Sequence, residues 1–234
     1  MEMIYCLVAL IVLIGLCYYM AKNFAELGEF INQGEKLTKQ EKSGLKFLKS
    51  KKSIYFFVVI SMFFMGASGI AFDLWQAKIF YSVCSVLLLA GFFMDVAIKL
   101  LPDLFTLSLL WVALLGAALG ITSMDPSQAI IASVVLYVSF MLIDTIGETI
   151  TKKVVLGGGD IKIMAAFGAL FGIMQSMILL IVACVIMIVF VTVMKLAKRG
   201  HDKELPFGLG LTTAAMINIF FPAIVNGLMN YLVI

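Results

Sequence analysis

The chain has 234 residues, of which 63% are hydrophobic and 13% are charged, and its formal net charge is +3. This balance excludes a soluble globular domain as the main part of the chain and is typical of a protein with several membrane spans. We therefore expect membrane lipids around it and no nucleic acid as a partner.

The cysteines and the single histidine indicate no metal site. Four cysteines are scattered through apolar stretches without a Cys-x-x-Cys pair, which predicts neither a zinc site nor a disulfide framework. They are Cys6, Cys17, Cys84 and Cys184. His201 lies among charged residues, which favours a solvated loop over a catalytic site. We expect no metal.

The N-terminal part consists of one apolar stretch and one basic stretch. Met3–Ala21 is long enough to cross a bilayer, and Met1 and Glu2 provide no positive segment before it, so residues 1–21 predict an uncleaved first span. Residues 22–53 contain many lysines and no cysteine, which predicts a short cytoplasmic loop. The N-terminus is then periplasmic. Part of the loop is either a helix on the lipid surface or simply solvated.

Residues 54–234 form a membrane-embedded core of seven further apolar blocks. The blocks are Ile54–Phe72, Ile79–Lys99, Phe105–Thr122, Ser127–Ile146, Ile161–Met174, Ser176–Lys195 and Phe207–Val233. Crossing the membrane at every block leaves Lys78 as the only basic residue outside, in agreement with the positive-inside rule. The sequence thus predicts an all-α, polytopic helical bundle of about eight transmembrane helices.

The stretch Gly157-Gly158-Gly159-Asp160 precedes one of these blocks. Glycines leave no side chain between the backbone and an approaching molecule. The apolar run from Ile161 predicts Asp160 at a helix N-terminus, which favours the charged acid. An acid at membrane depth is a functional hypothesis by default. The alternative is a helix cap after a flexible turn.

A second acid, Asp95, is predicted at the same depth, in the last turns of its span. Two carboxylates suit attack of water on a peptide carbonyl, in which one takes a proton from water and the other protonates the carbonyl oxygen. Our hypothesis is that Asp160 starts as the base and Asp95 as the acid. Asp144 is a third candidate, for which we favour a structural polar contact between helices.

These residues carry a resemblance to a known family. Asp95, Leu101-Pro102-Asp103, Gly157-Gly158-Gly159-Asp160-Ile161-Lys162 and Pro206-Phe207-Gly208 occur in this order. Together they resemble the bacterial type IV prepilin peptidases, which are GxGD-type intramembrane aspartic proteases of the inner membrane. The resemblance implies that Asp95 and Asp160 are catalytic, and that the substrates are type IV prepilins or pseudopilins, cut at the cytoplasmic face to remove a short basic leader.

The resemblance also bears on substrate contacts and cofactors. We expect Gly157, Gly158 and Gly159 to let the substrate strand come close, and by analogy alone Pro206, Phe207 and Gly208 to seat it. Larger members carry a domain with two Cys-x-x-Cys pairs and methylate the product with S-adenosylmethionine. This chain has no such domain after its first span, so we expect no cofactor unless the chain also methylates.

Other functions fit the sequence less well. Gly66-Ala67-Ser68-Gly69 matches the GxSG of rhomboid serine proteases, but no histidine is predicted on a span to act as base. No His-Glu-x-x-His occurs, which argues against a zinc protease. The main alternative is a transporter or channel subunit whose aspartates bind a cation. A purely structural assembly subunit is the third possibility.

Overall fold

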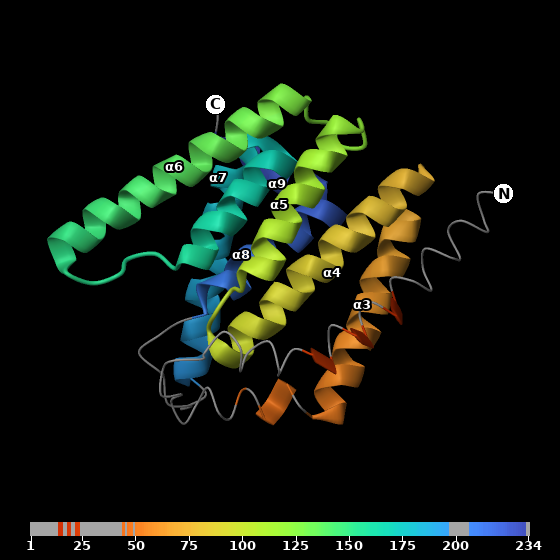
Figure 1. The fold of residues 1–234 in the computed structure, drawn as a ribbon, viewed down its shortest axis with the longest axis horizontal. Helices are drawn as coiled ribbons and strands as arrows, with labels where there is room; N and C mark the ends of the chain where they lie inside the picture. Colours follow the sequence, from red (N-terminus) through yellow and green to blue (C-terminus); the bar gives the residue numbers. More distant parts are fainter. Residues whose placement is uncertain are drawn as a thin grey trace.

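A computed structural model describes residues 14–15, 18–19, 22–23, 44, 46–48, 50–196 and 206–232. Most of the predicted first span and of the basic loop therefore lies outside the described residues. The described residues from Lys51 onward contain seven helices, shown in Figure 1. They are α3 (Lys51–Ala71), α4 (Trp75–Ile98), α5 (Asp103–Ala118), α6 (Pro126–Thr151), α7 (Gly158–Leu196), α8 (Phe207–Phe220) and α9 (Pro222–Leu232). The all-α prediction is confirmed for this part of the chain.

Four of these helices, α3, α4, α6 and α7, are long and apolar enough to cross a membrane. A fifth span is possible if α8 and α9 are taken together, although they are bent by 102° relative to one another. Helix α5 is apolar but has only 16 residues. The chain is therefore a multi-pass membrane protein, while the count of eight and the side of the N-terminus stay predictions.

Helix α7 joins two blocks that the sequence analysis separates. It runs for 39 residues, and Gly172 inside it has φ 81° and ψ 173°, far from helical values. Such a backbone conformation is open only to glycine, so the two halves of α7 meet at a kink. The hydroxyl of Ser176 donates to the Gly172 carbonyl oxygen at 2.6 Å, directly beside the kink.

The predicted block from Phe207 to Val233 is likewise not one continuous helix. Helix α8 ends at Phe220, and α9 begins at Pro222. Proline has no N–H to donate and disfavours the helical conformation of the residue before it, here Phe221. Pro222 is the local signal for this break, which the high content of apolar residues alone does not reveal.

The centre of the bundle is formed by α4 and α7. Helix α4 packs against α3, α5 and α8, and α7 packs against α5, α6, α8 and α9. Helices α6 and α7 approach closely at Gly168, where a Cβ would lie only 2.8 Å from the Ala132 carbonyl oxygen. This packing brings the C-terminal end of α4 together with the first turns of α7 and α8.

Candidate active site

Asp95 lies one turn before the end of α4 and is only 4% exposed. Its Oδ2 accepts a hydrogen bond from the backbone N–H of Leu209 at 2.7 Å. Because α8 begins at Phe207, this N–H belongs to the first helical turn, where it also donates to the Pro206 carbonyl oxygen at 3.2 Å. The buried carboxyl group is therefore held at the N-terminus of α8.

This contact gives the Pro206-Phe207-Gly208 element a physical place that the sequence analysis lacks. Pro206 directly precedes α8, where its fixed φ and missing N–H are tolerated. A Cβ at Gly208 would lie 3.0 Å from Asp95 Oδ2 and 2.5 Å from Leu101 Cδ1. The element thus starts the helix that binds Asp95, and its glycine lets that helix come close. A proline before an apolar run is the local signal for this helix start.

Asp160 is the third residue of α7, at the helix N-terminus as the sequence predicts. The carbonyl oxygen of Gly157 accepts the N–H groups of Asp160 at 2.9 Å and of Ile161 at 3.2 Å, which closes the first turn. The carboxyl group folds back over Gly157, where a Cβ would lie 2.9 Å from Oδ2, and interacts with the Gly157 backbone N–H. An acid at this position and a backbone N–H at the cap form half of a capping box.

The three glycines before Asp160 have different surroundings. Gly157 faces the Asp160 carboxyl group, and a Cβ at Gly158 would have no atom of the described part of the chain within 4 Å. A Cβ at Gly159 would instead lie 2.5 Å from Leu101 Cβ and 2.7 Å from the Leu101 carbonyl oxygen. Gly158 is the glycine beside open space, whereas Gly159 is needed for close packing against another part of the chain.

Leu101, in the connection between α4 and α5, is the residue on which the site converges. A Cβ at Gly91 of α4, at Gly159 of α7 or at Gly208 of α8 would lie within 3.1 Å of a Leu101 atom. Three elements that are far apart in sequence therefore pack on one half-buried side chain. The start of α8 that binds Asp95 and the first turn of α7 that contains Asp160 therefore meet at Leu101. In the sequence, Leu101 stands out only as part of the Leu101-Pro102-Asp103 motif, and no local signal marks its central position in the site.

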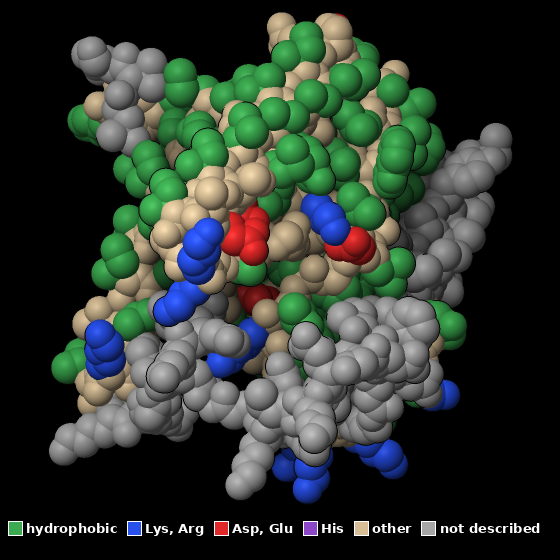
Figure 2. Space-filling model, turned by 60° about the vertical axis from the view of Figure 1, so that its left-hand side comes forward, with side chains coloured by type: hydrophobic (Ala, Val, Ile, Leu, Met, Phe, Trp, Pro, Cys, Tyr) green, Lys and Arg blue, Asp and Glu red, His purple; other side chains and the backbone are tan. Residues whose placement is uncertain are grey.

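An ion pair makes a second connection across the site. Lys162 Nζ lies 2.5 Å from Asp103 Oδ1 and joins the first turn of α7 to the start of α5. The Asp103 side chain is 60% exposed and that of Lys162 is 26% exposed. Figure 2 shows acidic and basic side chains gathered on one part of a face that is otherwise largely hydrophobic.

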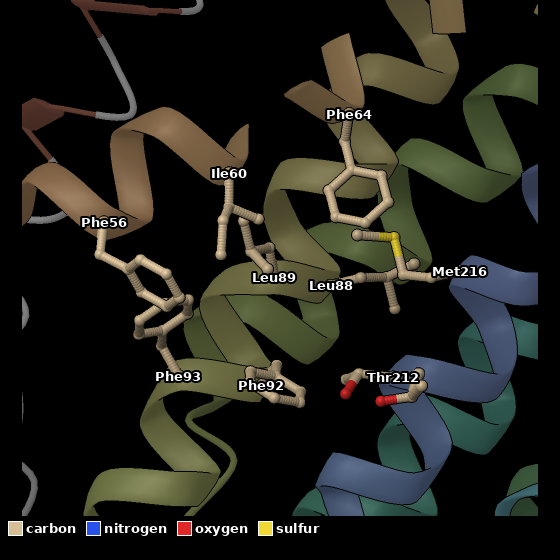
Figure 3. A pocket seen from close by; sticks show the side chains of 10 residues that line it. Phe56, Ile60, Phe64, Leu88, Leu89, Phe92, Phe93, Thr212 and Met216 are labelled. Carbon is tan, nitrogen blue, oxygen red and sulfur yellow. The ribbon is translucent and has the colours of Figure 1, made fainter. Parts of the chain in front are cut away.

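An apolar cavity of about 330 Å³ lies between α3, α4 and α8, as Figure 3 shows. Its lining consists of Phe56, Ile60, Phe64, Leu88, Leu89, Phe92, Phe93, Thr212, Thr213 and Met216. Leu88 and Phe92 precede Asp95 by seven and three residues and so share its face of α4. The Thr212 hydroxyl donates to the Gly208 carbonyl oxygen at 2.8 Å, so this hydroxyl already has a hydrogen-bond partner within its own helix. The cavity suits apolar groups.

Asp144 contacts a loop, whereas the sequence analysis favours a contact between helices. Its Oδ1 accepts the backbone N–H groups of Val155 at 3.1 Å and Leu156 at 2.9 Å, just before the glycines. Within the described residues, no three His, Cys, Asp or Glu side chains gather as metal ligands would. The site therefore contains Asp95, Asp160 and the loop before the glycines, which Asp144 contacts.

Comparisons with known proteins identify the same region. Residues 82–192 match the sequence model of the Type IV leader peptidase family. A "Prepilin leader peptidase/N-methyltransferase" of Legionella pneumophila is 31% identical over 148 residues, which are 62% of this chain and 51% of that protein. Proteins of the same name from Neisseria gonorrhoeae and Pectobacterium carotovorum are each 33% identical, over 64% and 72% of this chain and 54% and 59% of their own lengths.

The predicted resemblance to the prepilin peptidases is thus confirmed for this part of the chain. The chain spans about half the length of the curated relatives it matches. No solved structure matches it significantly. The comparisons give no support to the alternative of a transporter or channel subunit.

Proposed function

We propose that this chain is an intramembrane aspartic endopeptidase of the bacterial inner membrane. Its substrates are type IV prepilins or pseudopilins, from which it removes the short basic leader at the cytoplasmic face. The observation that carries this proposal is the meeting, at Leu101, of the two helix starts that hold the acids, which are 65 positions apart in the sequence: the start of α8, whose Leu209 N–H binds Asp95, and the first turn of α7, which contains Asp160. The names of the relatives supply the substrate class.

The proposed reaction needs only the two acids and water. One carboxylate takes a proton from a water molecule while the oxygen of that water attacks the peptide carbonyl carbon, and the other carboxyl group protonates the carbonyl oxygen. The tetrahedral intermediate then breaks its C–N bond as the nitrogen receives a proton. Because neighbouring acids do not both ionise readily, the pair shares one proton at the start of the cycle. We assign the base to Asp160 and the acid to Asp95.

The remaining groups would shape the place of the substrate. Among the described residues, no atom would lie within 4 Å of a Cβ at Gly158, which supports entry of the substrate strand beside this residue. In this proposal Gly157 and Gly159 fix the loop around Asp160. Pro206, Phe207 and Gly208 place the start of α8 against Asp95. We include neither a metal nor S-adenosylmethionine in this step.

The proposed topology has eight spans and a periplasmic N-terminus, with residues 1–21 as the first span, 22–53 as a cytoplasmic loop and 54–234 as the peptidase core. Lysines at the ends of α4 and α6 support it. Lys99 and Lys152 cap these two helices at their C-terminal ends, which are the ends nearest Asp95 and the glycine loop (Gly157–Gly159), respectively. A basic residue at a helix end is typical of the cytoplasmic side. The aspartates would then face the cytoplasm, where the basic leader lies.

Cleavage in membranes tests the proposal. Wild type, Asp95→Asn and Asp160→Asn are compared at equal expression with a candidate prepilin, and the N-terminus of the product is identified by mass. The cleavage rate of each variant should fall about a thousandfold or more, because no other group can take over the proton transfer of the missing carboxyl group. Asp125→Asn, a substitution of the same chemistry at the exposed start of α6, should cut normally. Persistent cutting by either active-site variant contradicts the mechanism, and a product heavier by one methyl reveals a second activity.

A further inference from the structure

We propose that Asp144 is a positioning residue that holds the glycine loop in the arrangement required for cutting. The connection from α6 to α7 crosses from the outer end of α6 back to the bundle, as Figure 1 shows. Asp144 Oδ1 accepts two consecutive N–H groups of this connection, those of Val155 and Leu156. Because a single oxygen accepts both N–H groups, two successive peptides are tied to α6, and these two bonds fix the local path of the backbone.

A second contact lies on the same face of α6. Gly147 follows Asp144 by three residues, so the two positions are neighbours on the helix surface. A Cβ at Gly147 would lie 2.7 Å from Val155 Cγ2, which means that the Val155 side chain rests directly on the helix backbone. One face of α6 therefore receives both the backbone and a side chain of the connection.

The position of Leu156 determines where the next turn begins. Leu156 directly precedes Gly157, whose carbonyl oxygen accepts the N–H of Asp160 at 2.9 Å. A displacement of the Leu156 peptide is therefore passed to Asp160 through one turn of the backbone. A misplacement of about 1 Å at a catalytic group can lower a rate about a hundredfold. The catalytic consequence of the Asp144 contact rests on the proposed function, whereas the contact itself does not.

The test measures the contact and the reaction separately, with Asp144→Ala, Asp144→Asn and the control Thr145→Ala. Thr145 is the neighbouring residue, and its hydroxyl bonds to the Met141 carbonyl oxygen in its own helix. Hydrogen exchange of the Val155 and Leu156 amides in detergent reports the contact. Initial rates of prepilin cleavage give kcat and KM.

Asp144→Ala should speed exchange of both amides about tenfold or more and lower kcat about tenfold or more, with KM within about twofold. Asp144→Asn keeps an oxygen that can accept both bonds, so it should behave nearly as wild type in both measurements. Thr145→Ala should match wild type. Gly147→Ala, which displaces Val155 without changing any charge, should act in the same direction as Asp144→Ala.

Three results would overturn the inference. Unchanged exchange in Asp144→Ala means that the contact is not formed. Faster exchange with an unchanged kcat means that the loop does not need this contact for the reaction. Normal exchange with a lost reaction in Asp144→Asn means that Asp144 acts through its charge as a third catalytic acid. If wild type cuts no prepilin, the proposed function fails, and the exchange measurement still decides whether Asp144 holds the loop.

Discussion

Replacement of Gly159 by alanine probes how the two aspartates are brought together. A Cβ at this position would lie 2.5 Å from Leu101 Cβ and 2.7 Å from the Leu101 carbonyl oxygen, whereas ordinary contacts begin at 3.4 Å. Neither atom lies at the end of a flexible side chain, so rotation about a side-chain bond does not relieve the overlap. The first turn of α7 and the Leu101 segment must separate by about 0.9 Å, the difference between 3.4 and 2.5 Å.

This separation affects the reaction more than the stability. Overpacking of this kind costs about 1–3 kcal/mol, and the higher helix propensity of alanine offsets up to about 1 kcal/mol of it. A displacement near 1 Å between the two acids lowers a rate about a hundredfold. We therefore expect Gly159→Ala to fold with a modestly lower unfolding temperature and to lose about two orders of magnitude in kcat.

The assay combines prepilin cleavage with thermal unfolding in detergent. Gly66→Ala, on the exposed face of α3, where no described residue has an atom within 4 Å of the new Cβ, is the control and should match wild type in both. Gly158→Ala has the same open surroundings but lies beside Asp160, so it should unfold as wild type and change KM. Cutting by Gly159→Ala at the wild-type rate would show that the Leu101 contact does not set the geometry of the pair.

Two further predictions concern the framework of the site. Gly172→Ala should lower the unfolding temperature, because φ 81° and ψ 173° strain any residue with a Cβ by about 1–3 kcal/mol; an unchanged thermal transition would argue against the kink. Asp103→Asn and Lys162→Gln should each lower stability by about 0–1 kcal/mol, the usual range for a partly exposed ion pair. The double variant should be no less stable than the less stable of the two single variants. If the two losses of unfolding free energy simply add in the double variant, the ion pair is not formed.

Local patterns in the sequence predict the helical class and the place of Asp160. Long apolar blocks indicate helices by themselves, and a run of glycines with an acid before such a block indicates a helix start. Both signals are local, because each lies within about ten residues of the helix or helix start that it predicts. Asp160 accordingly lies in the first turn of α7, and α3, α4 and α6 overlap the predicted blocks.

The convergence on Leu101 follows from contacts that no local pattern contains. Gly91, Gly159 and Gly208 approach it from three helices, and each glycine taken alone indicates only flexibility or close packing. The kink at Gly172 is hidden for a related reason, since a glycine within an apolar run is equally compatible with a straight helix. Positions of this kind depend on which helices pack together, and a pattern confined to a few neighbouring residues does not reveal that packing.

The start of α8 changes the argument for the roles of the two acids. From the sequence, a helix N-terminus is predicted for Asp160 alone, but Asp95 is also bound at such a terminus, that of α8. The difference that remains is access. Asp95 is 4% exposed, whereas Asp160 is half-buried and lies next to Gly158, the glycine with open space beside it. Because a base must reach the water that it deprotonates, this difference in access favours Asp160 as the base and leaves Asp95 to act on the carbonyl oxygen from the closed side of the site.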